Sequence, residues 1–156
     1  MKVLIVYFSR FGNTRLAAEV MAEAASSNGD VQVQAFAELT PEVLRAAELG
    51  LFGTPTHRMN LPEELRPLLA GLPKGCLRGT AVAAFDTSYK MNGFLTRMTA
   101  AKKLDRKLRR LGGKRVARPE TFIVSGREGP LAEGELARAR AWAAALVREL
   151  APVPLS

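Results

Sequence analysis

The feature that most restricts the fold of this chain is an apolar run near its start that shows no alternation. Residues Lys2 to Phe8 read KVLIVYF, a stretch rich in β-branched and aromatic side chains. A strand with one face in water alternates apolar and polar residues, so this run predicts a strand buried on both faces, as in a parallel sheet. Ser9 to Asn13 break the run, and an amphipathic helix is predicted from Thr14 onward. The start of the chain therefore predicts a strand–helix unit.

The same succession of strand and helix continues along the chain. Apolar runs predict four further strands, at residues 31–36, 49–53, 80–85 and 121–124. Helical spacing predicts four further helices, at residues 41–47, 61–70, 94–111 and 136–150. Five strands that alternate with helices predict an α/β fold, a doubly wound five-stranded parallel sheet with helices on both faces. We expect one domain over residues 1–150 and a flexible tail over residues 151–156.

Composition is typical of one globular domain with a single principal site. The chain has 156 residues, of which 47% are hydrophobic. The apolar run at the start is too short for a signal peptide or a membrane span, so we expect a cytoplasmic protein. The one cysteine, Cys76, cannot form an internal disulfide and lies near no metal-ligand motif. We predict no metal site, and no residue stands out as a catalytic acid, base or nucleophile.

Ligands of doubly wound sheets bind beyond the carboxyl ends of the strands, so the loops after the first, third and fourth strands are the candidate site. The first loop, Ser9 to Thr14, joins a buried strand to a helix N-terminus. Backbone amides, short hydroxyl side chains and the helix dipole can hold a phosphate there, which Gly12 allows to come close. The same residues also suit a plain helix cap. A P-loop lysine and a Gly-x-Gly-x-x-Gly turn are absent, which disfavours nucleotide triphosphatases and classical dinucleotide-binding folds.

Two of these loops together resemble loops of the flavodoxin family. The segment SRFGNT, Ser9 to Thr14, is similar to the family's phosphate loop. The segment GTPTHRMNLP, Gly53 to Pro62, is similar to the second loop, which covers one face of the flavin ring. Phe85 to Lys90 takes the place of the third loop, where an aromatic residue often flanks the other face. The resemblance covers nearly the whole chain by element order, and it implies the strand order 2-1-3-4-5 and FMN as cofactor.

The resemblance also implies which residues hold the cofactor. The first loop would bind the FMN phosphate through backbone and hydroxyl groups, the second would line the flavin, and Tyr89 would stack on it or close over it. His57 departs from the tyrosine or tryptophan that many flavodoxins carry there. His57 and Arg58 equally suit solvated loop residues, Tyr89 a packing residue, and Asp86 the cap of a turn. The predicted cofactor-binding residues are Ser9, Arg10, Phe11, Gly12, Asn13, Thr14, Thr54, Pro55, Thr56, His57, Arg58, Asp86, Thr87 and Tyr89.

Positive charge is the unusual property of this chain. The formal net charge is +8 and the pI is near 10.3, whereas the low-potential carriers of the family are generally acidic. Arg58 and His57 near the flavin therefore predict a higher reduction potential than that of an acidic flavodoxin. Most of the excess charge lies on the fourth helix and just after it, where Asp105 is the only acid. These cations are Arg97, Lys102, Lys103, Arg106, Lys107, Arg109, Arg110, Lys114, Arg115 and Arg118.

This basic cluster has several interpretations. It suits a solvated helix face, the docking of an acidic redox partner, capture of an anionic substrate or of the phosphates of NAD(P)H, or incidental affinity for nucleic acid. No aromatic residues are interleaved with the charges, which disfavours specific nucleic-acid recognition. We expect an acidic redox partner protein that docks near the fourth helix.

Three functions are compatible with these observations. The leading one is an FMN-binding electron-transfer protein, in which the cofactor carries the redox chemistry and the protein tunes it. The second is an NAD(P)H-dependent FMN reductase of quinones or similar acceptors, although the longer loops usual for such enzymes are missing. The third is a flavin-free anion-binding or regulatory module, since a fold does not by itself fix a function.

Overall fold

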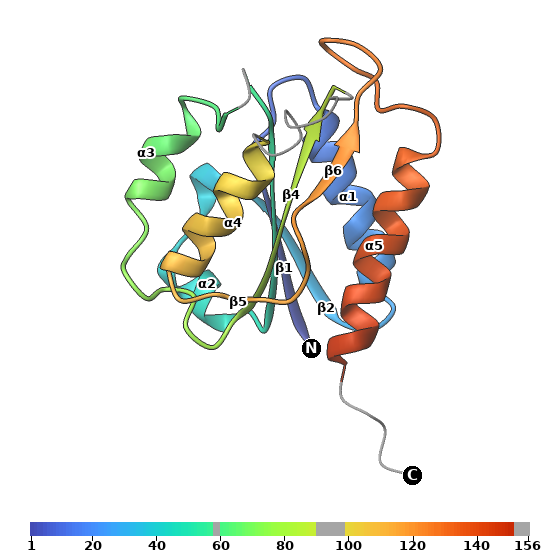
Figure 1. Ribbon diagram of the computed structural model, residues 1–156. Helices are drawn as coiled ribbons and strands as arrows, with labels where there is room; N and C mark the ends of the chain where they lie inside the picture. Colours follow the sequence, from blue (N-terminus) through green and yellow to red (C-terminus); the bar gives the residue numbers. More distant parts are fainter. Residues whose placement is uncertain (58–59, 90–98, 152–156) are drawn as a thin grey trace.

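A parallel sheet forms the centre of the molecule and carries helices on both faces (Figure 1). The computed structural model describes residues 1–57, 60–89 and 99–151. The strands are β1 (Lys2–Tyr7), β2 (Asp30–Ala35), β3 (Leu49–Pro55), β4 (Ala81–Ser88), β5 (Lys114–Arg115) and β6 (Glu120–Ile123). Their order is β2-β1-β3-β4, and both β5 and β6 pair in parallel with β4. The predicted α/β fold and the strand order 2-1-3-4-5 are confirmed.

The helices divide between the two faces of the sheet (Figure 1). They are α1 (Asn13–Ala25), the 3-10 helix η1 (Phe36–Glu38), α2 (Pro41–Ala46), α3 (Leu65–Ala70), α4 (Ala100–Arg110) and α5 (Glu135–Leu150). Helices α1 and α5 pack together on one face, whereas α2, α3 and α4 cover the other. Within the described ranges, no helix combines the length and the apolar character needed to cross a bilayer.

Strand β1 is buried on both of its faces, as its unbroken apolar sequence predicts. Val3 and Ile5 belong to the hydrophobic cluster under α1 and α5. Leu4 and Val6 belong to the cluster on the opposite face, under α2, α3 and α4. None of these four side chains is more than 2% exposed. Because side chains alternate between the faces of a strand, one run of apolar residues supplies both layers of the core.

The fifth position of the sheet differs from the single predicted strand. It is divided into β5, which pairs with Ala81 and Val82, and β6, which pairs with residues 85–88. Residues 116–119 lie between the two strands; the amide of Val116 still donates to the carbonyl of Val82, and paired strand resumes at Glu120. Pro119 has no N–H to donate to a neighbouring strand, which is one reason why regular pairing stops there.

Strand β4 is longer than its sequence predicts. We expected a loop from Asp86 to Gly93, and this expectation is wrong for residues 86–88, which continue the strand. The extension is paired on both sides, with Thr54 and Pro55 of β3 and with residues 121–123 of β6. Pairing with two neighbours therefore keeps this polar segment, Asp-Thr-Ser, in the sheet although its composition is typical of a turn.

Helix α3 starts later than predicted, and the predicted start of the fourth helix lies outside the described residues. Residues 61–64 form a turn in which the amide of Leu65 donates to the carbonyl of Pro62, and α3 begins only at Leu65. The described part of the fourth helix begins at Ala100, and residues 94–98 of the prediction lie outside the described residues. The predicted tail, 151–156, also lies outside them except for Ala151.

Candidate functional site

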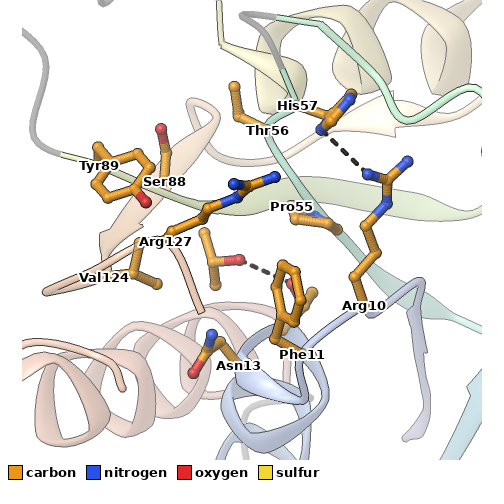
Figure 2. A pocket seen from close by; sticks show the side chains of 12 residues that line it. Arg10, Phe11, Asn13, Pro55, Thr56, His57, Ser88, Tyr89, Val124 and Arg127 are labelled. Atoms are coloured by element: carbon orange, nitrogen blue, oxygen red, sulfur yellow. Dashed lines mark hydrogen bonds between the residues drawn. The ribbon is translucent and has the colours of Figure 1, made fainter. Parts of the chain in front are cut away.

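A pocket of about 480 Å³ opens at the carboxyl ends of β1, β3, β4 and β6. This is the edge of a doubly wound sheet at which ligands are expected. The volume lies in the range of small-molecule sites, roughly 300–1,000 Å³. Figure 2 shows the side chains that line it. They are Arg10, Phe11, Asn13, Thr14, Pro55, Thr56, His57, Thr87, Ser88, Tyr89, Val124 and Arg127.

The loop between β1 and α1 is built to expose amide groups. Gly12 precedes α1 with a φ of 90°, a conformation that favours glycine. The hydroxyl oxygen of Ser9 accepts hydrogen bonds from the amides of Gly12 and Arg15, at 3.1 and 3.4 Å. Among the described residues, the amides of Asn13 and Thr14 have no acceptor. Free amides at the positive end of a helix provide an anion site.

Two buried hydroxyl groups join this loop to the sheet. Thr14 at the start of α1 and Thr87 in β4 lie 2.8 Å apart between their Oγ1 atoms, and both are nearly inaccessible to solvent. This hydrogen bond fixes the first turn of α1 against the floor of the pocket. Thr54, by contrast, is fully buried, donates to the carbonyl of Pro55, and does not line the pocket. Its contact with the cofactor stays a prediction.

Arg10 crosses from the first loop to the second. One of its nitrogens lies 3.1 Å from Nδ1 of His57 (Figure 2), and the other donates to Glu64 at 2.6 Å. A guanidinium can only donate, so Nδ1 of His57 accepts and the ring carries its proton on Nε2. The backbone of His57 also pairs with Asn60. Arg58, also predicted to bind the cofactor, lies outside the described residues.

Asp86 lies beneath the pocket and does not line it. Its side chain is fully buried, and Oδ2 accepts the hydroxyl of Thr56 at 2.6 Å and the amide of Ala101 at 3.1 Å. The amide of Ala100 donates to the same Thr56 hydroxyl at 3.0 Å. Burial raises the pKa of the Asp86 carboxyl, and the hydrogen bonds from Thr121, Thr56 and Ala101 oppose that shift. The group predicted as a cofactor contact instead supports Thr56, which does line the pocket.

The sequence did not indicate one side of the pocket. Val124 and Arg127, after β6, and Ser88, at the end of β4, also line it. The Arg127 guanidinium reaches into the pocket, toward Pro55 and Thr56 (Figure 2). No motif marks residues 124–130. Only position could have indicated these residues: the fifth strand of the predicted sheet ends beside β4, so the loop that follows it was also a candidate for the site.

A hydrogen bond joins the loop after β6 to the loop between β1 and α1, which is the candidate phosphate site. Nδ2 of Asn13 donates to the carbonyl of Glu128 at 3.0 Å. The next residue, Gly129, has a φ of 98°, and a Cβ atom there would lie 2.3 Å from Oδ1 of Asn13. Both the backbone conformation and the space therefore favour glycine at this position.

The pocket combines exposed aromatic rings with positive charge. Phe11 is 53% exposed and Tyr89 is 47% exposed, which is unusual for large aromatic side chains. Arg10 and Arg127 contribute cationic groups, and among the described lining residues there is no carboxylate. The arrangement suits a flat aromatic ligand that carries an anionic group at the end near α1.

Comparison with known proteins agrees with this geometry. The family model described as Flavodoxin matches residues 5–142, which is most of the chain. The chain belongs to the flavodoxin family. A curated flavodoxin from Clostridium saccharobutylicum is 28% identical over 95 residues, and the match covers 60% of this chain and 59% of that protein. The chain thus spans less than two thirds of the length of this relative.

Solved flavodoxin structures share the fold. A flavodoxin from the domain Archaea superposes with a TM-score of 0.74 at 23% identity, covering 96% of this chain and 98% of the other. Oxidised flavodoxin 2 from Bacillus cereus superposes with a TM-score of 0.79 at 21% identity, covering 96% of this chain and all of the other. The family resemblance inferred from the two loops is confirmed by the family model. At these identities the superpositions establish the fold alone.

Membership in the flavodoxin family implies FMN, and the donor groups of this pocket fit that molecule. FMN has an anionic phosphate, a polar ribityl chain and a flat tricyclic ring. The free amides of Asn13 and Thr14 suit the phosphate, and the hydroxyls of Thr56 and Ser88 suit polar groups. The exposed ring of Tyr89 suits the flat ring system.

Proposed function

We propose that this chain binds one FMN in the pocket and serves as an electron-transfer protein. The observation that carries the proposal is that an amide-rich helix N-terminus and an exposed aromatic ring lie in one pocket, whose described lining residues include no carboxylate. A phosphate bound at Asn13 and Thr14 would leave the ring to extend toward His57 and Tyr89. FMN, when bound, supplies one- and two-electron redox chemistry that no amino-acid side chain here offers.

The residues of this chain would bind, orient and tune the cofactor. The hydroxyl of Ser9 accepts hydrogen bonds from the amides of Gly12 and Arg15 and so shapes the loop. The amides of Asn13 and Thr14 are thereby left available for the phosphate. Thr56 is held in place by Asp86 and α4, so the second loop is preorganised. Preorganisation of this kind lowers the entropic cost of binding. Tyr89 and the Pro55–His57 segment would exclude water from the ring faces.

The cations of the pocket would raise the reduction potential. Reduction adds negative charge, and both Arg10 and Arg127 line the pocket. Arg10 is paired with Glu64 at 2.6 Å, whereas Arg127 has no ion-pair partner in the described ranges, so Arg127 would contribute more. Attraction between these cations and the added charge favours the reduced state. Arg58, on which the expectation from the sequence chiefly rests, lies outside the described residues, so the proposal rests on the cations that line the pocket. Redox titration of the purified holoprotein tests this; a potential as low as that of an acidic flavodoxin would contradict it.

An electron carrier needs a partner, and we propose an acidic protein that docks on the basic side of α4. The reductase alternative stays a second candidate, which NAD(P)H consumption by the pure protein would favour. A flavin-free module is the third. Oxidoreductase activity and a cytoplasmic location stay predictions.

The decisive experiment is a titration of the purified protein with FMN, in which binding is measured by absorbance and by the quenching of FMN fluorescence. We expect saturable one-to-one binding. The variant T14V removes the hydroxyl next to the proposed phosphate position. Its FMN affinity should fall about tenfold, because this hydroxyl would donate to the phosphate and also bonds to Thr87, which anchors the loop. The variant T40V, at the cap of α2, is the control. Absence of binding at micromolar FMN would refute the proposal.

A further inference from the structure

A second cavity of about 340 Å³ lies between α3 and α4, on the face of the sheet opposite α1 and α5. Five cations line it: Arg66 on α3, and Lys103, Arg106, Lys107 and Arg110 on α4. Leu61, Leu69 and Ala70 supply its apolar part, and no carboxylate is among its lining residues as far as the structure is described. We call this cavity the basic groove.

The cations of α4 form one stripe along the helix. Positions 103, 106, 107 and 110 follow the i, i+3, i+4, i+7 spacing that places residues on one side of an α-helix. The stripe is about 10 Å long at 1.5 Å per residue. Leu104 and Leu108 lie fully buried in the core beside it. The helix therefore turns its leucines to the sheet and a row of cations to the groove.

The one acid of α4 does not neutralise this stripe. Asp105 is buried and pairs with Arg109 at 3.0 Å and with Arg115 at 3.6 Å. These two arginines do not line the basic groove. In the described ranges, Arg106 and Arg110 have no ion-pair partner within the chain.

The groove begins next to the FMN pocket. Leu61 at its end follows Asn60, whose backbone is paired with that of His57 in the pocket. Arg66 donates to the carbonyl of Leu61 at 3.4 Å and so fixes this end of the groove. A molecule seated in the groove would therefore lie beside the loop that edges the pocket. Electron transfer needs such proximity between the two redox centres.

We propose that the basic groove docks an acidic segment of a redox partner protein, with carboxylates on the α4 stripe and an apolar side chain on Leu61, Leu69 and Ala70. The inference rests on the proposed electron-transfer function, whose partner and docking residues it specifies. Charge complementarity supplies specificity and fast association, and the apolar part supplies contact area. Among the described residues that line the groove there is no aromatic side chain on which a nucleobase would stack, so nucleic acid and nucleotides fit it less well.

The test measures binding of a defined probe by fluorescence anisotropy at low salt. The probe is a labelled twelve-residue peptide, four repeats of Glu-Glu-Leu, and the comparison peptides replace either glutamate by glutamine or leucine by serine. The protein variants are R106Q/R110Q in the groove and R118Q/R148Q outside it. Both pairs remove the same charge from exposed positions. Melting curves check that all variants are folded.

We expect the groove variant to weaken binding of the Glu-Glu-Leu peptide by roughly fivefold to tenfold, and the control variant by less than about twofold. Replacement of leucine by serine should also weaken binding. Equal weakening in both variants would overturn the proposal, since only net charge would then matter. Tighter groove-dependent binding of NADPH or of a dT oligonucleotide would also overturn it.

An FMN titration of the same proteins separates the two proposals. Unchanged FMN affinity in R106Q/R110Q is expected, because neither residue lines the FMN pocket. If no protein bound FMN while the peptide still bound in the groove, the proposed electron-transfer function would fail and the acidic-segment site would remain. If FMN bound and the peptide did not, the docking proposal alone would fail.

Discussion

The hydroxyl of Thr56 donates a 2.6 Å hydrogen bond to the carboxylate of Asp86, which is fully buried below the FMN pocket. The two side chains together accept the first two amides of α4, from Ala100 and Ala101. Thr99, the residue that precedes α4, makes no side-chain cap of its own. Asp86 and Thr56 thus replace the usual helix cap, and they join the second loop of the pocket to the helix that lines the basic groove.

We expect the variant D86A to lose stability and FMN affinity together. It removes the acceptor of Thr56 and of the Ala101 amide, and buried groups left without partners cost about 1–3 kcal/mol. Urea unfolding measures the stability, and fluorescence titration measures the FMN affinity. The control is T40A, because Thr40 caps α2 through the amide of Val43 away from the pocket and should cost about 1 kcal/mol. Loss of FMN affinity in T40A, or its retention in D86A, would contradict the link between cap and pocket.

The variant D86N should change the pH dependence of stability. Burial raises the pKa of Asp86 above its ordinary value of 3.8, so the folded protein binds this proton more tightly than the unfolded chain does. The corresponding stabilisation is present below that ordinary value and is lost as the pH rises through the raised pKa. Asparagine does not titrate. The free energy of unfolding of wild type minus that of D86N should therefore decrease from pH 4 toward pH 8, and a constant difference would show that Asp86 titrates normally.

Removal of the Arg127 charge should lower both FMN affinity and reduction potential. The guanidinium of Arg127 reaches into the pocket, and in the described ranges it has no ion-pair partner. The loss of about 1 kcal/mol of attraction corresponds to about 20 mV for a two-electron couple. Spectroelectrochemical titration of R127Q against wild type measures this shift. R148Q, an exposed position on α5 with the same charge change, should leave the potential where it is, and a shift of equal size there would assign the effect to net charge.

Removal of the Arg138 charge should lower the stability of the fold and change FMN affinity little, because Arg138 does not line the FMN pocket. Its guanidinium lies 4.5 Å from the ring centroid of Phe122 and bridges Glu135 and Glu120 at 2.8 and 2.5 Å, which fastens α5 to β6. The variant R138Q should lose about 1–2 kcal/mol in urea unfolding near pH 7. Hydrogen bonds from Arg138 lower the pKa of Glu135 below 4.5, so this contribution is present above 4.5 and is lost as the pH falls. The gap between wild type and R138Q should close in acid; a gap that widened in acid would be inconsistent with the pairing.

The sequence predicts the framework of this protein better than its site. The unbroken apolar run of β1 and the helical spacing around it depend on local pattern, and the two layers of the core agree with them. The strand order agrees with the one that the family resemblance implies. Asp86 shows why the site is harder. A short polar residue after an apolar run is typical of a turn, and only pairing with both β3 and β6 keeps it in the strand. Such pairing is a property of the assembled sheet.

Arg127 shows the same limit from the other direction. Nothing in the residues around it resembles a binding motif, and its position in the pocket depends on the contact of Asn13 with Glu128, which lie 115 positions apart in the chain. The first loop, in contrast, carries its geometry in its own sequence, because Ser9 and Gly12 shape it locally. Local motifs are therefore predictable from sequence, whereas residues brought in by long-range pairing are not.

Replacement of Gly129 should test whether that long-range contact shapes the pocket. A Cβ atom at Gly129 would meet the Asn13 side chain at 2.3 Å, whereas one at Gly134 would meet nothing within 4 Å, and both positions have a positive φ. G134A therefore measures backbone strain alone, about 1–2 kcal/mol. G129A should cost about 1 kcal/mol more, because Asn13 must release the Glu128 carbonyl, and it should weaken FMN binding about fivefold while G134A leaves it unchanged. Equal FMN affinities in the two variants would mean that the Asn13–Glu128 hydrogen bond does not help to form the phosphate site.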